Sequence, residues 1–240
     1  IANTEGIIHG PANVLSQGTT EMYRAEVGYP IGYFWGYETA GVFQNQAQID
    51  EYRASGKGLY DTTQPGDVIF VDKNGDGQIT DADKTMIGDP NPNVTSGLTL
   101  TLGYKGFDFA VTAYGAFGQQ IAKSYRSFAD MPLENFTTVI LNCWDGEGTS
   151  NFLPRLTDGT STNWQNISDL YIEDADYVKI SNITIGYDFK KLFKNMPLSQ
   201  ARLYFTAQNL FTITGYSGMD PEVGYAGSTN SAYDWGSGID

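Results

Sequence analysis

The clearest chemical signature in the sequence lies in one short stretch, residues 72–83, which reads DKNGDGQITDAD. Oxygen-bearing side chains stand at its first, third and fifth positions, and glycine follows at the sixth. This is the spacing of a calcium-binding loop, which a backbone carbonyl at position seven and an acid at position twelve complete. The predicted ligands of a structural Ca²⁺ ion are therefore Asp72, Asn74, Asp76, Gln78 and Asp83.

This loop departs from the usual calcium pattern at two points. Asp83 replaces the usual glutamate at the twelfth position, and its shorter side chain weakens a bidentate contact. The preceding residues 67–71 (DVIFV) indicate a strand instead of a helix. The expected unit is thus strand, loop and helix. The alternative is a polar turn rich in Asp, Asn and Gly that holds no metal.

The composition excludes several other kinds of site. The 240 residues contain one Cys and one His, which rules out a Cys-based zinc site and most catalysis that depends on His. Asp and Glu number 28 against 14 Lys and Arg, giving a formal net charge of −14 that does not suit a nucleic-acid partner. We predict no catalytic residues and no enzymatic activity.

Alternation of apolar and polar residues predicts the main strands of the chain. Residues 98–104 read LTLTLGY, and after the two-residue turn Lys105-Gly106 the alternation resumes over 107–114, a pattern typical of a hairpin. Residues 183–189 and 203–213 alternate in the same way, and a change of phase between Ile180 and Ile183 suggests a bulge or an earlier start of the strand. A fifth strand is expected over residues 32–42.

The connections between these strands alternate between short and long. Those at 105–106 and 190–200 are short, whereas 43–96, 119–176 and 214–240 are long, with short helices expected at 44–53 (capped by Asn45) and 135–144. Outer-membrane barrels show this alternation of short turns and long external loops, and soluble sandwiches do not. We therefore predict an all-β fold, an antiparallel transmembrane β-barrel segment. Its five strands are fewer than the roughly eight that close a barrel.

Several segments together resemble one family. Residues 30–50 (PIGYFWGYETAGVFQNQAQID), 65–93, 174–189 and 201–223 (ARLYFTAQNLFTITGYSGMDPEV) are similar to the C-terminal part of SusC/RagA-type TonB-dependent transporters. The resemblance implies an importer of oligosaccharides or peptides in the cell outer membrane. Residues 1–240 would then form the C-terminal part of the barrel, and residues 43–96 an extracellular loop region.

The same resemblance implies partners. A SusD-type surface lipoprotein would close over the barrel mouth, outer-membrane lipid would surround the wall, and the TonB complex would act through an N-terminal part that is absent from this chain. The last barrel strand is expected beyond residue 240. Trp144 and Trp164 are weak candidates for contact with an oligosaccharide or peptide, since aromatic rings stack on sugars and pack on peptides.

Two other functions stay open at this stage. One is a secreted, calcium-stabilised β-domain that binds carbohydrate through exposed aromatic residues. The other is a glycoside hydrolase, which needs paired carboxylates in a cleft, whereas no Glu pair stands at the ends of adjacent predicted strands. The leucines at 98, 100 and 102 distinguish these alternatives. In a barrel segment they would face lipid, so the purified protein would need detergent. In a soluble domain they would be buried in a closed core.

Overall fold

The computed structural model describes residues 8–9, 22–26, 28–123, 138–157, 162–193, 197–199, 201–218 and 220–222. The chain divides into two compact units. We call residues 92–120 and 174–240 the sheet unit, and residues 1–91 and 121–173 the loop unit.

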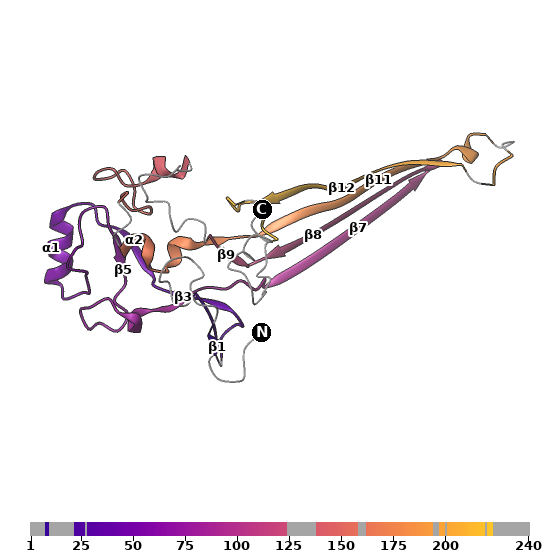
Figure 1. The fold of residues 1–240 in the computed structure, drawn as a ribbon. Coiled ribbons are helices and arrows are strands. Elements are labelled where there is room, and N and C mark those ends of the chain that lie inside the picture. Colours follow the sequence, from indigo (N-terminus) through magenta and orange to yellow (C-terminus); the bar gives the residue numbers. More distant parts are fainter. Residues whose placement is uncertain are drawn as a thin grey trace, which may run out of the picture. The chain divides into compact units, whose positions relative to one another are not determined.

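Four long strands make up the sheet unit (Figure 1). They are β7 (Val94–Tyr104), β8 (Phe107–Phe117), β11 (Tyr177–Asp188) and β12 (Arg202–Thr214), in the spatial order β12-β11-β8-β7, and every neighbouring pair is antiparallel. With 11 to 13 residues each, these strands reach the roughly 9–11 residues that a tilted strand needs to cross a bilayer.

The pairing register gives this sheet one apolar and one polar face. Leu100 pairs with Val111, Val111 with Ile183, and Ile183 with Ala207, so one row across the sheet is apolar. The next row, on the opposite face, runs through Thr101, Ala110, Thr184 and Thr206. Successive side chains of a strand point to opposite faces, so the alternation seen in the sequence becomes two chemically distinct surfaces.

The apolar face carries large side chains that no described residue of the sheet unit covers. Leu98, Leu203 and Phe205 are 65%, 68% and 69% exposed. Leu100, Leu102 and Ile185 on the same face are also exposed. A contiguous apolar surface of this kind is uncommon on soluble monomers. The described residues therefore do not form the closed soluble core that would have contradicted a membrane wall.

A bulge confirms the predicted change of phase in β11. Ile180 pairs with Ala113 and Asn182 with Thr112, so Ser181 is an extra residue, and its hydroxyl donates to the carbonyl oxygen of Thr112 at 3.0 Å. β12 also shifts register here, where Asn209 has a φ of 49°. Because of the bulge, Lys179 and Asn182 lie on the same polar face even though they are three positions apart.

The two short connections lie at the same end of the sheet. Lys105 and Gly106 form the turn between β7 and β8 with φ values of 48° and 95°, as a primed hairpin turn requires. Residues 189–201, which begin with the 3₁₀ turn η5 (Phe189–Lys191), join β11 to β12. Aromatic rings gather at this end, with Tyr187 4.5 Å from Phe107 and 5.1 Å from Phe189 between ring centroids.

On the polar face near this end, an ion pair joins two strands across a third. The guanidinium of Arg202 on β12 donates to both carboxylate oxygens of Asp108 on β8, with Nε 3.0 Å from Oδ1. Gly186 of β11 lies beneath them, and a Cβ there would be 2.5 Å from Oδ1 of Asp108. The missing side chain at Gly186 therefore lets the pair cross the middle strand.

The loop unit contains short strands in small sheets. One sheet has the order β1 (Ile8–His9), β2 (Tyr23–Ala25), β3 (Tyr33–Gly36) and β6 (Thr85–Gly88), and a second pairs β4 (Thr39–Val42) with β5 (Val68–Phe70). The single strand expected over 32–42 is therefore wrong. Between β3 and β4 the chain is held by tertiary contacts, since Tyr37 bridges Ser168 and Thr39 donates to Asp169.

The remaining elements are short. Helix α1 (Gln46–Ala54) follows the predicted cap, since the Asn45 side chain accepts from the Gln48 amide at 3.0 Å. The helix expected at 135–144 is a 3₁₀ turn, η3 (Thr138–Asn142), and residues 135–137 lie outside the described part. The others are η1 (Asp81–Asp83), α2 (Thr162–Gln165), η4 (Asp169–Tyr171) and the paired strands β9 (Gln120–Ala122) and β10 (Ile172–Asp174).

No helix within the described residues is long and apolar enough to cross a membrane.

Strand β5 organises the core of the loop unit, because all three of its residues are buried. Val68 and Phe70 pack with Tyr37 and Leu170, whereas Ile69 points the other way and packs with Phe43 and Ile49. Such a strand, buried on both faces, reads as a continuous apolar run in the sequence.

Substitutions at adjacent positions of β7 test the assignment of the two faces. We expect Leu100→Lys in the full-length protein to destabilise the folded barrel by about 2–4 kcal/mol, because a charge at mid-membrane faces lipid. Thr101→Lys, one residue away on the polar face, is the matched control and should cost far less. The folded fraction after refolding into lipid vesicles, followed by heat-modifiable gel mobility, measures both. Equal losses would contradict the assignment.

Candidate functional site

The calcium-type loop connects β5 to β6 in the loop unit, and its first residue organises its turn. The Asp72 carboxylate accepts from the backbone amides of Gly75 at 2.6 Å, Gly77 at 2.8 Å and Gly58 at 3.0 Å. Loss of solvation alone would raise the pKa of Asp72, but these amide donors outweigh it and hold the pKa below its usual value. Asp72 is thus ionised and tied to the backbone at three points.

The exposed middle of the loop is held by its own side chains. Oδ1 of Asn74 accepts from the Asp76 amide at 2.9 Å, and Oδ1 of Asp76 accepts from the Gln78 amide at 2.8 Å. The Asn74 amide group also donates to Oδ2 of Asp76 at 2.9 Å. Gly77, with a φ of 83°, provides the left-handed conformation that the sixth position of such a loop requires.

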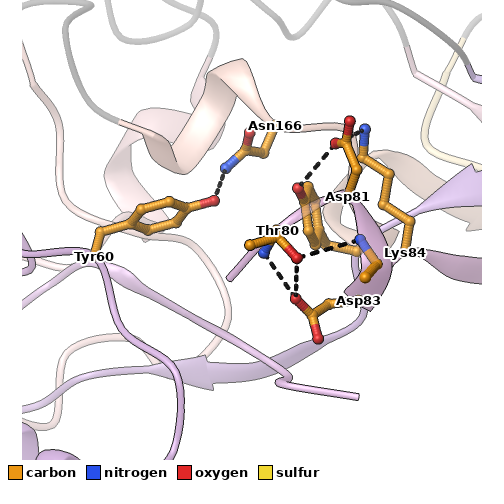
Figure 2. A network of polar contacts seen from close by, with 8 residues as sticks. Tyr60, Thr80, Asp81, Asp83, Lys84 and Asn166 are labelled. Atoms are coloured by element: carbon orange, nitrogen blue, oxygen red, sulfur yellow. Dashed lines mark hydrogen bonds and ion pairs between the residues drawn. The ribbon is translucent and has the colours of Figure 1, made fainter. Parts of the chain in front are cut away.

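The twelfth residue, Asp83, is fully buried and closes both ends of the loop. Its Oδ1 accepts from the amides of Lys73 at 3.0 Å and Asn74 at 3.3 Å, and its Oδ2 accepts from the Thr80 amide at 2.7 Å. Figure 2 shows the Thr80 side, where the Thr80 side chain in turn caps the short helix η1. This reciprocal arrangement is a capping box, which satisfies amides at a helix start.

A second layer of contacts joins the end of the loop to the core (Figure 2). The Lys84 ammonium lies 2.8 Å from Oδ1 of Asp81, the same oxygen that accepts from the Tyr37 hydroxyl at 3.5 Å. Asn166 donates to the Tyr60 hydroxyl at 3.1 Å. Burial is the main cause that raises the pKa values of both Tyr37 and Tyr60, so both hydroxyls are neutral at physiological pH.

The eighth residue of the loop anchors it in the core. Ile79, at the eighth position, packs against the cluster of Tyr37, Val68, Phe70 and Leu170. Gly58 allows the loop to lie close to the preceding segment, since a Cβ there would be 2.8 Å from the carbonyl carbon of Gln78. The loop is therefore built into the core of the loop unit on one side and exposed on the other.

The donor set has the oxygen chemistry that calcium prefers, but its oxygens serve the backbone in this structure. Among the described residues, no three or more Asp, Glu, His or Cys side chains converge in a group that could hold a metal. The oxygens of Asp72, Asn74, Asp76 and Asp83 accept loop amides, as given above. Calcium binding by these residues and Gln78 stays a prediction.

Of the two tryptophans suggested for substrate contact, Trp144 has its side chain within the described part of the structure. It is half-buried, and its indole nitrogen lies 3.3 Å from Oε1 of Gln44. The Trp144 ring packs against Gly66, where a Cβ would be only 2.4 Å from the ring. This packing explains Trp144 as part of the loop unit's structure. Trp164 lies in α2, and its side chain is outside the described part of the structure.

Sequence reasoning missed a second group of polar residues, in the sheet unit. The Glu222 carboxylate, eight residues after the end of β12, contacts the Tyr114 hydroxyl, the Tyr177 hydroxyl and the Lys179 ammonium. These partners come from β8 and β11. Nothing in the local sequence signals the contact, because 43 to 108 positions separate the partners.

Comparisons with known proteins give one consistent result, although no family model matches the chain. TonB-dependent receptor P3 of Formosa agariphila is 33% identical over 225 residues, which cover 93% of this chain and 22% of the receptor. TonB-dependent receptor SusC of Bacteroides thetaiotaomicron is 30% identical over 212 residues, which cover 87% of this chain and 19% of SusC. The chain thus spans about a fifth of the length of these relatives.

Solved structures agree with this relationship. The RagAB peptide transporter matches 91% of this chain and 22% of its own chain, with a TM-score of 0.63 and 23% identity. The RagAB peptide importer in the closed-closed state matches 85% of this chain and 22% of its own chain, with a TM-score of 0.59 and 25% identity. The predicted all-β, antiparallel barrel segment is confirmed, and it is incomplete. Over the part that it shares with these relatives, the chain belongs to the SusC/RagA-type TonB-dependent receptors of the outer membrane.

Proposed function

We propose that this chain is part of the wall and external loops of an outer-membrane, TonB-dependent importer of oligosaccharides or peptides. The observation that carries the proposal is its similarity to TonB-dependent receptors over 93% of its length. The proposed partners are a SusD-type surface lipoprotein and the TonB complex, the latter through a part of the protein outside this chain. The relatives are receptors and transporters, which supports a function other than catalysis.

The two faces of the sheet unit support this function physically. A wall strand must present apolar side chains to lipid and polar side chains to the lumen. The row through Leu100, Val111 and Ile183 suits lipid, and the row through Thr101 and Thr184 suits a hydrated lumen. A secreted carbohydrate-binding domain is the weaker alternative, because it would leave the apolar face in water.

The substrate class is proposed at the level of oligosaccharides or peptides. One group of similar structures is named as a peptide transporter, and one relative is SusC. Trp144 is a poor first choice for substrate contact because its ring is packed in the loop unit. Exposed residues of the loop unit are better candidates, because the proposed role as external loops would give them contact with substrate.

We also propose a structural Ca²⁺ ion at Asp72, Asn74, Asp76, Gln78 and Asp83. The sequence spacing and the oxygen chemistry support it, as does the left-handed Gly77. The ion would stiffen the exposed side of the loop, whereas Asp83 already holds the buried side through backbone amides. Calcium would thus add to a loop that closes without it.

An uptake experiment tests the proposed transport function. Cells that lack the full-length protein should lose import of either a fluorescent oligosaccharide mixture or a fluorescent peptide mixture, and cells without TonB should show the same loss. Re-expression of the protein should restore import and should recover a SusD-type lipoprotein by co-purification. Unchanged import of both mixtures in the deletion strain would refute the proposal.

Calorimetry tests the calcium proposal. Full-length protein stripped with a chelator should bind one Ca²⁺ in this loop with a dissociation constant on the order of 10⁻⁴ M, typical of extracellular sites. Asp76→Ala should abolish the heat because it removes an exposed ligand without touching the core. Asp50→Ala, an exposed acid on α1, is the control and should leave binding unchanged. No calcium heat in the parent protein would end the claim.

Hydrogen exchange tests the role of Asp83 independently of calcium. In chelator, Asp83→Ala removes the charged acceptor of the amides of Lys73, Asn74 and Thr80, and a hydrogen bond to a charged group contributes about 1.5–3 kcal/mol. We expect exchange at these amides to rise by about tenfold or more. Asp76→Ala should change them little. Equal effects of the two substitutions would show that Asp83 does not close the loop.

A further inference from the structure

A segment that follows the last described strand contacts the polar face of the sheet unit, although it is not itself part of the sheet. After β12 ends at Thr214, the chain returns to the sheet at residues 220–222. The Pro221 carbonyl accepts from the side-chain amide of Gln119 at 2.9 Å, and the Glu222 amide donates to Oδ1 of Asp220 at 2.9 Å. A small turn is thus fixed against the sheet.

The Glu222 carboxylate receives three donors from two strands. Oε1 accepts from the hydroxyls of Tyr114 and Tyr177, the latter at 3.3 Å, and Oε2 pairs with the Lys179 ammonium. The Lys179 and Glu222 side chains are only 14% and 24% exposed. Burial alone would raise the pKa of Glu222, but the bonds from Lys179 and the tyrosines lower it, so the carboxylate is charged.

The register identifies the face on which this contact lies. Lys179 pairs with Tyr114, and Tyr114 lies two residues from Thr112 on β8, which pairs with Thr99. Because β8 has no bulge against β7, Tyr114 and Thr112 share a face, and it is the polar one. Tyr177, two residues before Lys179, lies on the same side. Glu222 therefore meets the face that the barrel turns toward its lumen.

The contact also has a definite position along the strands. Tyr177 is the first residue of β11 and pairs with Ala116 near the end of β8. The two short connections, 105–106 and 189–201, lie at the other end, where Tyr187 pairs with Phe107. The contact is therefore at the end of the sheet where the long connections begin.

We propose that Glu222 is a latch that anchors the segment following β12 on the lumen side of the barrel wall, at the end opposite the short turns. Residues 220–222 then lie against the lumen-facing side of the wall and occupy part of the lumen. The latch also engages the hydroxyls of Tyr114 and Tyr177, which would otherwise face the lumen as free polar groups. Glu222 is thus a positioning residue: it fixes residues 220–222 on the inner surface of the barrel, which a substrate would contact.

A charge swap in the full-length, detergent-purified protein tests the latch. The readout is the rate of limited chymotrypsin cleavage after Tyr216, which is partly buried in the segment between β12 and the latch. Glu222→Gln should raise this rate by about tenfold, because a charge-assisted contact of the segment is lost and its open state becomes more populated. Lys179→Glu should raise it further by repulsion.

The double variant Lys179→Glu with Glu222→Lys should restore slow cleavage to within about threefold of the parent, because the pair is rebuilt with reversed signs. Arg202→Met, which breaks the ion pair with Asp108 at the other end of the sheet, is the matched control and should leave cleavage after Tyr216 unchanged. Heat-modifiable mobility confirms a folded barrel in each variant. Parent-like cleavage in Glu222→Gln, or no recovery in the swap, would overturn the proposal.

Discussion

The requirement that every backbone polar group find a partner within the membrane constrains the whole sheet unit. Lipid offers no hydrogen bonds, so strands can cross it only when each ladder bond is made by a neighbour. Within the described residues, β8 and β11 meet this on both sides, and β7 and β12 meet it on their inner sides. The registers run unbroken from end to end except at one bulge. Side-chain chemistry then follows, since a regular ladder forces alternate residues toward lipid and lumen.

The bulge and the glycine at position 186 show how the wall departs from regularity without losing its bonds. Ser181 is extra in β11, yet its hydroxyl donates to the Thr112 carbonyl. Gly186 lacks the side chain that would collide with the Asp108 carboxylate, and so Arg202 reaches Asp108 over it. Both features lie on or next to the polar face, where a hydrated lumen tolerates hydrogen-bonding groups.

The loop unit follows a different principle around residues 72–83, because acidic side chains there accept backbone amides that have no ladder partner. Asp72 and Asp83 together accept six backbone amides, from Gly58, Gly75, Gly77, Lys73, Asn74 and Thr80. Asp67 binds the Arg155 side chain at 2.7 Å and the Asn163 side chain at 2.9 Å. The excess of acid in the sequence is thus partly structural, since carboxylates are strong acceptors for orphan amides.

The sequence by itself determined the features that depend on near neighbours. Alternation gave the hairpin around Lys105-Gly106 and the phase change at Ile180, Asn45 gave the start of α1, and the apolar run gave β5. Only the tertiary structure decided that residues 32–42 split into β3 and β4, because Tyr37 forms a bridge with Ser168 and Thr39 donates to Asp169, both far along the chain. It also decided that Asp83 is buried as an amide acceptor and that Glu222 reaches Lys179, 43 residues away. Periodicity records which face a residue takes, whereas a long-range polar partner depends on where distant strands meet, which no local pattern encodes.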